Sequence, residues 1–332
     1  MNHKKYDLIG VGAPILDTLV RVEEAFLKQH VSGQKGGMEL VDNEQLQGLV
    51  SVLPTCSTDS PGGSAGNTTF ALARLGFRTA FIGKMGNDEA AQIFKSSYQQ
   101  MGGDTSLLKQ ADAPNARCLS LITPDSQRTM RTLLGASALL SPEEISVCDF
   151  QDTAHVHVEG YLLFNPPLII KILESARQAG CTISLDLASF EVVAAAGDRL
   201  PGLLEEYVDI VFANEDEAAA CFPGEKDADL QAAAFTPWCR IAAVKIGSQG
   251  SWIATPESVL RVPSVPVESP LDTTAAGDLW AAGFLCGWLK NLPLDTCGRF
   301  GSKLGAEVVQ VLGAALPEER WQAVLRDFSD SR

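Results

Sequence analysis

The alternation of short apolar runs with helical segments is the feature that most limits what this chain can fold into. Six apolar runs lie at residues 6–11, 79–82, 154–158, 182–185, 210–213 and 241–245. Between them, the spacing of apolar residues predicts helices at 65–75, 89–100, 168–178 and 215–221. Three further helices are predicted at 275–288, 294–311 and 317–328. Because uniformly apolar strands need cover on both faces, this pattern predicts an α/β fold with a mostly parallel sheet and helices on both faces.

Four extended segments have no helix between them and break this rhythm. They lie at 14–22, 36–41, 117–123 and 128–134. We expect them to assemble into one small antiparallel sheet that forms a β lid over the main sheet, drawn from about 14–41 and 117–134. The chain has no repeat, low-complexity tract or obvious linker. Residues 1–332 are therefore predicted to form a single domain with this discontinuous lid.

Charge and cysteine content narrow the classes of partner. The formal net charge of −15 provides no global positive field, so we expect neither nucleic acid nor an anionic membrane as a partner. No stretch has the length that a membrane span needs. The eight cysteines include no C-x-x-C pair, which favours reduced thiols in a cytoplasmic protein over a disulfide framework or a zinc site. They are Cys56, Cys118, Cys148, Cys181, Cys221, Cys239, Cys286 and Cys297.

The heptapeptide DTTAAGD at residues 272–278 is the strongest chemical signal. The small residues Ala275, Ala276 and Gly277 would leave backbone N–H groups uncovered where a helix begins. These donors and the partial positive charge of the helix end suit the negative charge of a transferring phosphoryl group. Asp278 would lie beside them and could accept the proton of an attacking alcohol. The alternative is a plain N-cap, where Thr and Asp are favoured for stability alone.

A glycine turn leads into a helix at residues 61–76, PGGSAGNTTFALARLG. Gly62 and Gly63 would let a ligand approach the backbone closely. The amide of Asn67 has a donor and an acceptor, a combination that can bind a pair of hydroxyl groups. The alternative is an ordinary glycine turn with a capped helix.

Two further stretches follow predicted strands. Residues 213–217, ANEDE, lie at the carboxyl end of a strand, where open α/β sheets bind ligands. Asn214 and Glu217 could hold phosphate and hydrated Mg²⁺ there, or could form only an acidic helix start. Residues 245–252, KIGSQGSW, could form a turn that lies against the adenine or ribose of ATP. The alternative is an ordinary hairpin turn, which the two glycines around a polar pair resemble.

Together these four stretches resemble the ribokinase-like, or PfkB-type, carbohydrate and nucleoside kinases. The N-terminal signature of the family, two glycines with a downstream Asn and Leu-Gly, is matched by Gly62, Gly63, Asn67, Leu75 and Gly76. Its C-terminal signature DTxGAGD is matched at 272–278, its N-x-x-E motif at 214–217 and its G-x-x-G-x-D stretch by IGKMGND at 82–88. The resemblance runs from Asp7 to about Gly313, near the adenosine-kinase-like branch.

The resemblance implies a role for each matched residue and a requirement for ATP and Mg²⁺. Asp278 is implied as the base that deprotonates the acceptor hydroxyl, beside an anion hole formed by Ala275, Ala276 and Gly277. Substrate binding is implied for Asp17, Gly63 and Asn67. ATP binding is implied for Asn214, Glu217, Gly247 and Gly250. Glu217 would hold Mg²⁺ through water, and Asp272 matches a position that helps bind a monovalent cation such as K⁺.

This chain departs from the family signature at one place, because the first glycine of the anion hole is Ala275. Alanine keeps the N–H group but disfavours positive φ, so we expect a loop conformation that alanine tolerates and retained activity. This departure favours an alternative from another class, a non-catalytic ligand-binding protein that retains the fold.

The sequence indicates the type of reaction more narrowly than it indicates the acceptor substrate. Likeness to the adenosine-kinase-like branch adds Glu159, at a strand end, and Arg131, in the lid segment 128–134, as substrate-binding candidates. Arg131 is alternatively a solvated strand residue. Our first expectation is phosphorylation of a hydroxymethyl group of a sugar, and the alternative is a nucleoside such as adenosine. If the lid has an exposed apolar face, two lids would pack together as a homodimer.

Overall fold

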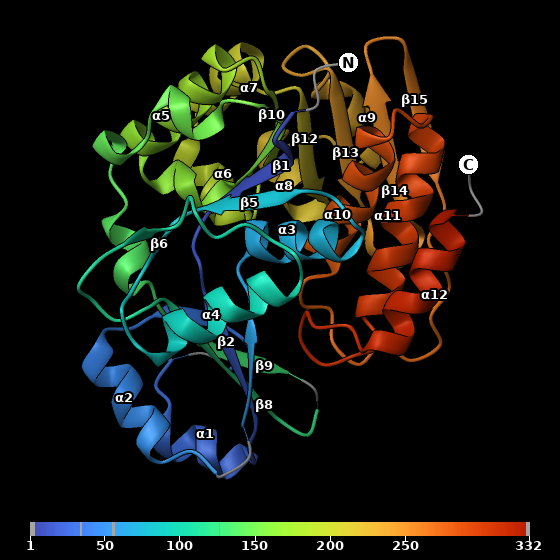
Figure 1. Ribbon diagram of the computed structural model, residues 1–332. Helices are drawn as coiled ribbons and strands as arrows, with labels where there is room; N and C mark the ends of the chain where they lie inside the picture. The colour runs from blue at the N-terminus through green and yellow to red at the C-terminus, as the bar shows by residue number, and fades with distance from the viewer. Residues whose placement is uncertain (1–3, 34, 55–56, 126, 330–332) are drawn as a thin grey trace.

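The computed structural model describes residues 4–33, 35–54, 57–125 and 127–329. Within them, the main sheet has eight strands in the order β15-β14-β13-β12-β11-β10-β1-β5 (Figure 1). Strands β13 to β5 run parallel, and β14 and β15 add an antiparallel edge. The bounds are β1 (Tyr6–Val11), β5 (Thr79–Ile82), β10 (Thr153–Glu159), β11 (Thr182–Asp186), β12 (Ile210–Asn214), β13 (Ile241–Lys245), β14 (Ser251–Thr255) and β15 (Ser258–Val262). The expected parallel strands are confirmed, whereas β14 and β15 were not predicted.

Helices cover both faces of this sheet, as the uniformly apolar strands require. Along β1, Leu8 packs in one core and Ile9 and Val11 in the other, because successive side chains of a strand point to opposite faces. The first core includes α3 (Ser64–Arg74), α10 (Ala276–Leu289), α11 (Leu294–Val308) and α12 (Glu318–Ser329). The second includes α5 (Pro166–Gln178), α6 (Phe190–Ala196), α7 (Arg199–Tyr207), α8 (Glu215–Cys221) and α9 (Ala228–Ala234). Helix α4 (Glu89–Gln100) packs against α3 through Phe94 and Phe70.

Helix α10 is buried on all sides, which fixes the position of its first turn. Every residue from Leu279 to Gly287 is buried, a pattern typical of a helix enclosed by its neighbours. Gly283 allows close contact with α11, since a Cβ there would lie 2.3 Å from the Phe300 carbonyl oxygen. The start of α10 is thus held rigidly against the sheet.

The lid is a second sheet with the order β3-β9-β8-β2-β4, seen at the bottom of Figure 1. Its strands are β2 (Leu16–Arg21), β3 (Met38–Leu40), β4 (Ser57–Pro61), β8 (Arg117–Ile122) and β9 (Arg128–Leu133). Our expectation of a purely antiparallel sheet was wrong, because β2 pairs with β8 and β3 with β9 in parallel. Only β8 and β9 are joined by a short connection, and strands joined through distant segments are free to pair in parallel.

The outer face of the lid is covered by the chain itself. Helices α1 (Glu24–His30) and α2 (Asn43–Ser51) pack there around the buried Leu27 and Leu46. Helix α2 and strand β4 extend the lid beyond the expected ranges 14–41 and 117–134, whereas α1 lies within the first of them. The inner face of the lid sheet faces the main sheet.

The remaining elements are short. They are strands β6 (Lys84–Met85) and β7 (Lys109–Gln110) and the 3₁₀ helices η1 (Gly135–Leu139), η2 (Pro142–Glu144), η3 (Val147–Phe150), η4 (Gly160–Phe164) and η5 (Gly247–Gln249). Among the described residues, no helix combines the length and the apolar character that a membrane crossing demands.

Candidate active site

A cavity of about 1150 Å³ lies between the lid and the carboxyl ends of the parallel strands. The last residues of β10, β11, β12 and β13 all line it, namely Glu159, Asp186, Asn214 and Lys245. Open α/β sheets bind their ligands at this edge. The volume exceeds what one small ligand fills and suits two substrates side by side.

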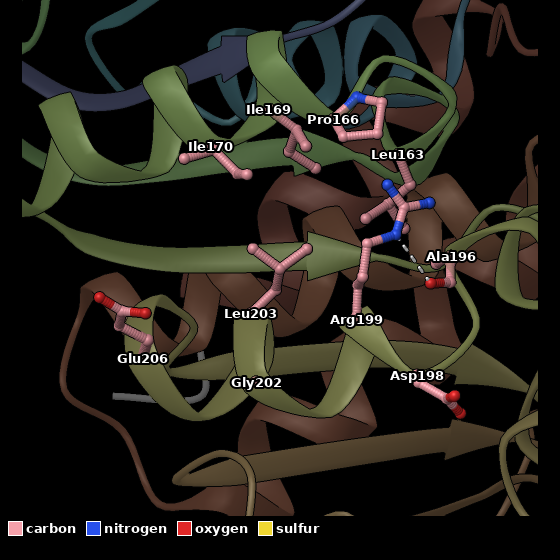
Figure 2. A pocket seen from close by; sticks show the side chains of 10 residues that line it. All are labelled: Leu163, Pro166, Ile169, Ile170, Ala196, Asp198, Arg199, Gly202, Leu203 and Glu206. Carbon is pink, nitrogen blue, oxygen red and sulfur yellow. Dashed lines mark hydrogen bonds between the residues drawn. The ribbon is translucent and has the colours of Figure 1, made fainter.

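A second hollow, of about 290 Å³, lies between α5 and α7 (Figure 2). Its walls are mostly apolar, and the Arg199 guanidinium is turned back onto the Ala196 carbonyl at 3.2 Å. None of the residues expected to carry chemistry lines it.

Asp278 lies in the first turn of α10 and is held by α3. Ser64 Oγ donates to Asp278 Oδ1 at 3.0 Å, and Asn67 Nδ2 donates to Asp278 Oδ2 at 2.9 Å. Thr68 Oγ1 donates to the Asp278 carbonyl oxygen at 3.0 Å. Burial, followed by the nearby Asp186 carboxylate, raises the pKa of Asp278 to about 6, against the opposing effect of the Asn67 donor. The glycine turn with its helix at 61–76 and the heptapeptide at 272–278 therefore meet at the Asp278 carboxylate.

The expected anion hole lines the cavity, with one of its donors already used. The Ala276 N–H donates to the Thr273 carbonyl at 3.2 Å, whereas the N–H groups of Ala275 and Gly277 have no acceptor among the described residues. Ala275 has φ of +58°, the left-handed conformation. Our expectation that the loop would suit alanine was therefore wrong, since an L-residue there carries a cost of about 1–2 kcal/mol that glycine avoids.

Asp17 enters the cavity from β2 and lies against the glycine turn. A Cβ on Gly62 would lie 2.2 Å from Asp17 Oδ2, so only glycine leaves room for this carboxylate. Gly63 has φ of +86°, and a Cβ there would lie 2.6 Å from the Ala13 carbonyl oxygen. Burial raises the pKa of Asp17 to about 7, although the Arg128 guanidinium opposes the shift.

Glu159 lines the cavity, and its carboxylate also bridges the turn after β1 and the start of α3. It accepts hydrogen bonds from the Ala13 N–H at 2.9 Å and from the Ala65 N–H at 3.5 Å. Burial raises its pKa to about 7. Its contacts thus position the turn after β1 and the start of α3.

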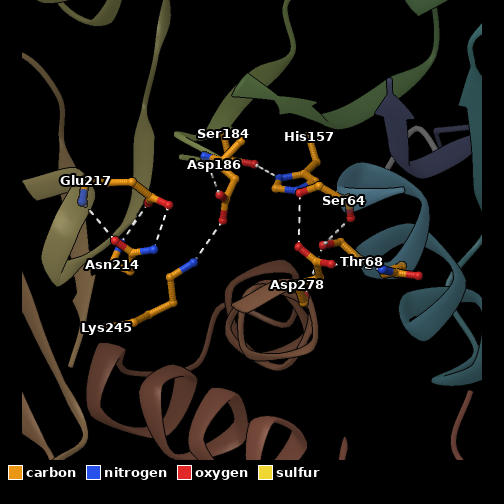
Figure 3. A network of polar contacts seen from close by, with 11 residues as sticks. Ser64, Thr68, His157, Ser184, Asp186, Asn214, Glu217, Lys245 and Asp278 are labelled. Carbon is orange, nitrogen blue, oxygen red and sulfur yellow. Dashed lines mark hydrogen bonds and ion pairs between the residues drawn. The ribbon is translucent and has the colours of Figure 1, made fainter. Parts of the chain in front are cut away.

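Asn214 and Glu217 line the cavity and form a capping box at the start of α8 (Figure 3). Asn214 Nδ2 donates to Glu217 Oε1 at 2.7 Å, and Asn214 Oδ1 accepts from the Glu217 N–H at 2.8 Å. Burial first, and the Asp186 carboxylate second, raise the pKa of Glu217 to about 7. The N-x-x-E spacing therefore serves the helix start and also places oxygen ligands in the cavity.

Gly247 and Gly250 form the turn of the β13–β14 hairpin and line the cavity. Their φ values are +54° and +101°, and a Cβ on Gly250 would lie 2.1 Å from the Val262 carbonyl oxygen. The hairpin that the sequence offered as the alternative is therefore present, and its turn lines the cavity.

Two buried charges that we did not single out from the sequence complete the polar end of the cavity. Lys245 Nζ lies 2.9 Å from Asp186 Oδ2, and the Ala188 N–H donates to Asp186 Oδ1 at 3.0 Å. The signal for both was a charged residue at the last position of an apolar strand.

Arg131 does not reach the cavity, and Arg128 does. Alternation along β9 places Arg128, Met130 and Thr132 on the cavity face and Arg131 on the outer face. Arg131 donates to the carbonyl oxygens of Met130 and Ser32 and pairs with Glu39 at 3.5 Å. The strand was identified correctly, but the sequence did not tell which of its faces meets the substrate.

Asp272 is paired with Arg128 at 3.1 Å. Its carboxylate also accepts hydrogen bonds from the Thr274 N–H at 2.9 Å and the Gly313 N–H at 2.8 Å. The guanidinium of a lid residue therefore already pairs with the carboxylate that the resemblance assigns to a monovalent cation.

Buried histidines lie beneath the site. His157 Nδ1 and His155 Nε2 each lie 2.8 Å from Ser184 Oγ, and burial lowers their pKa values to about 4 and about 3. Within the described part of the chain, no group of three or more His, Cys, Asp or Glu side chains is placed to hold a metal ion. The histidines are thus neutral hydrogen-bonded strand residues.

Comparison with known proteins agrees with this geometry. The pfkB family carbohydrate kinase pattern matches residues 38–321. An ATP-dependent ribose-1-phosphate kinase from Halopiger xanaduensis is 30% identical over 248 residues, covering 74% of this chain and 79% of that protein. The structure of adenosine kinase from Sinorhizobium meliloti is 30% identical with a TM-score of 0.86, covering 98% of this chain and 99% of that chain. A probable sugar kinase from Rhizobium etli is 29% identical with a TM-score of 0.87, at the same coverage.

The fold, the family match and these relatives point to the same class of protein. The chain belongs to the pfkB family of carbohydrate kinases, and it is an ATP-dependent kinase whose acceptor is an alcohol group of a sugar or nucleoside.

Proposed function

We propose that this kinase transfers the γ-phosphoryl group of ATP to the primary hydroxyl group of a nucleoside. The observation that carries the proposal is the apolar wall at the lid end of the cavity. Met38 and Leu40 on β3 are 45% and 61% exposed, and Phe164 on η4 is 58% exposed, although all three are large apolar residues that line the cavity. Leu134 and Tyr161 also line the cavity and are partly exposed.

A planar base would cover these side chains, whereas a free sugar would leave them in water. Covering a large apolar side chain is worth about 1.5–3 kcal/mol, and aromatic contacts add to this. Exposed apolar groups that gather around a cavity mark a binding surface. The walls therefore favour an acceptor with an aromatic ring.

A free sugar is the second candidate, and it was our first expectation from the sequence. Asp17 favours it equally well, because a half-buried carboxylate without a hydrogen-bond donor among the described side chains suits hydroxyl groups of either class. Proteins named as sugar kinases also occur among the relatives.

In the proposed reaction, Asp278 removes the proton of the acceptor hydroxyl as its oxygen attacks the γ-phosphorus of ATP. The bond from γ-phosphorus to the bridging oxygen breaks, ADP leaves, and the proton stays on Asp278 until it passes to solvent. The free N–H groups of Ala275 and Gly277 and the Arg128 guanidinium stabilise the charge on the transferring group. Gly247 and Gly250 border the nucleotide.

The residues at the strand ends fit Mg²⁺, which binds oxygen ligands and keeps several waters. Glu217 and Asn214, with the Asp186 carboxylate nearby, would hold the hydrated ion together with the phosphates. Bound Mg²⁺ would neutralise part of the phosphate charge. A K⁺ ion at Asp272 stays a prediction, and because Arg128 already pairs with that carboxylate we expect only a weak dependence of activity on K⁺.

Assembly and location are also proposals. The lid face that a homodimer would use is packed against α1 and α2, which favours a monomer over the expected lid-to-lid dimer. The cytoplasmic location stays a prediction. The seven described cysteines are free, and Cys56 lies outside the described residues.

Initial rates with adenosine, other nucleosides, ribose and fructose test the acceptor class. We expect a higher kcat/KM for a nucleoside, and a double variant Met38→Ser/Leu40→Ser should raise KM for the nucleoside about 10–100-fold. The matched control is Leu230→Ser, an exposed apolar residue on α9 that does not line the cavity. A sugar with the highest kcat/KM, or a nucleoside KM that the double variant leaves unchanged, would contradict the proposal.

A further inference from the structure

Lys245 has an unusual position for a buried lysine, because its ammonium group lies against the start of a helix. A Cβ on Gly277 would lie only 3.1 Å from Lys245 Nζ, so the ammonium packs directly onto the first turn of α10. The side chain is 13% exposed and lines the cavity. Figure 3 shows its ammonium group directed toward Asp186. A helix start carries partial positive charge, so a cation there is unfavourable unless anions are present.

Anions surround this lysine from several elements. Asp186 at the end of β11 pairs with it at 2.9 Å, and Glu217 of α8 and Asp278 of α10 act on it electrostatically. Burial alone would lower the pKa of Lys245, but Asp186 and Glu217 outweigh that effect and raise it. Lys245 is therefore charged and held in place against Gly277.

We propose that Lys245 is a catalytic residue whose ammonium group donates to the oxygens of the γ-phosphoryl group during transfer, and that Asp186 is the positioning residue that holds it there. The lysine stays protonated throughout, and only its hydrogen bonds change. The transferring group carries its negative charge on three equatorial oxygens and would pass the start of α10, against which the ammonium lies. The proposal rests on phosphoryl transfer at this site and not on which alcohol accepts the group.

The competing explanation is purely structural. In that case Lys245 only neutralises the buried Asp186 and Glu217 carboxylates, and the phosphoryl group does not contact it. The two explanations predict different values of kcat when the charges of Asp186 and Lys245 are removed together.

The first experiment compares Lys245→Met with Lys245→Arg in the whole enzyme. We expect Lys245→Met to lower kcat about 10²–10³-fold while KM for the acceptor changes less than threefold, and Lys245→Arg to recover part of the loss. The control is Lys28→Met, an exposed lysine of α1 on the outer side of the lid. A kcat within threefold of wild type for Lys245→Met would overturn the proposal.

Calorimetry gives a readout that needs no acceptor. A non-hydrolysable ATP analogue with a methylene bridge to the γ-phosphate should bind at least tenfold more weakly to Lys245→Met, whereas ADP should bind within threefold of wild type. Equal losses for both ligands would overturn the assignment to the γ-phosphoryl group. Because this measurement is independent of the acceptor, a wrong acceptor in the proposed function leaves its outcome unchanged.

The double variant Asp186→Asn/Lys245→Met separates the two explanations even if Lys245→Met folds poorly, since it removes both buried charges. We expect kcat for the double variant to lie at least tenfold below that of Asp186→Asn alone, because Asp186→Asn still has the ammonium. A double variant as active as Asp186→Asn, or more active, would show that Lys245 only balances charge.

Discussion

Asn67 donates a hydrogen bond from its side-chain amide to the Asp278 carboxylate over 2.9 Å, across 211 residues of sequence. This contact joins the start of α3 to the start of α10, and Ser64 adds a second donor to the other carboxylate oxygen. The carboxylate that we propose as the catalytic base is thereby held in one orientation facing the cavity. Its position depends on both motifs being intact.

Replacement of Asp278 by Asn should remove proton transfer while leaving the shape of the site. We expect kcat to fall about 10³–10⁴-fold, because general-base catalysis supplies an effect of this size. The measurement is turnover of the accepted substrate, together with ATP affinity by calorimetry, which should stay within threefold. Turnover above a tenth of wild type would exclude Asp278 as the base.

The activity of the enzyme should rise with pH as Asp278 ionises. Its pKa is raised to about 6, and only the deprotonated carboxylate accepts a proton, so log kcat/KM should fall below about pH 6 and level off above it. The Asn67 donor lowers this pKa, so Asn67→Ala should move the acid limb to higher pH. An acid limb that Asn67→Ala leaves in place would mean that another group controls it.

Replacing Ala275 with glycine, the residue of the family signature at this position, should make the protein more stable. Because φ is +58°, Ala275→Gly relieves a left-handed strain of about 1–2 kcal/mol, partly offset by the greater freedom of glycine in the unfolded chain. We expect a net gain of about 0.5–1 kcal/mol in the free energy of unfolding. Denaturant titration measures it, and Ala276→Gly, at the first position of α10, is the matched control that should instead destabilise. A loss of stability in Ala275→Gly would contradict the assigned conformation.

Substitutions of Arg128 and Arg131, two arginines on β9, should affect activity and stability separately. Arg128→Met removes a charge that lines the cavity, so kcat should fall about 10²–10³-fold. Arg131→Met leaves the Ser32 and Met130 carbonyls without their donor on the outer face of the lid, so unfolding should become easier by about 1–3 kcal/mol with kcat within threefold. Rates and denaturant midpoints of both variants check the pair. The reverse outcome would assign the wrong face of β9 to the substrate.

Glu159 should make the protein more stable in mild acid than at neutral pH. Its pKa is raised to about 7 in the folded state, above its ordinary value of 4.5, so the folded protein binds the proton more tightly than the unfolded chain. The resulting stabilisation is complete below about pH 4.5 and is lost as pH rises through 7. The difference in Tm between wild type and Glu159→Gln, measured from pH 5 to 8, should therefore change with pH. A constant difference would mean that Glu159 does not titrate in this range.

The sequence determined the layers and the reaction. Apolar strands such as Ile241–Lys245 and the spacing of 272–278 carry their own signal, because strand burial and helix-start chemistry depend on residues close together in the chain. Asp278, the glycine turn and the N-x-x-E motif could therefore be singled out as candidates without coordinates. Asp186 and Lys245 could not, since each is a single charge whose partner lies 59 residues away.

Only the tertiary structure decided which face of each lid strand meets the cavity. A shift of one residue exchanges the two faces, and the local pattern of 128–134 has charged and apolar residues on both, so Arg128 and Arg131 were indistinguishable by sequence. The same holds for DTTAAGD, where the sequence named the anion hole and the fold determined that Ala275 is left-handed and that Ala276 has already used its N–H. Backbone conformation and the pairing of distant charges are set by packing between elements, which no short stretch of sequence contains.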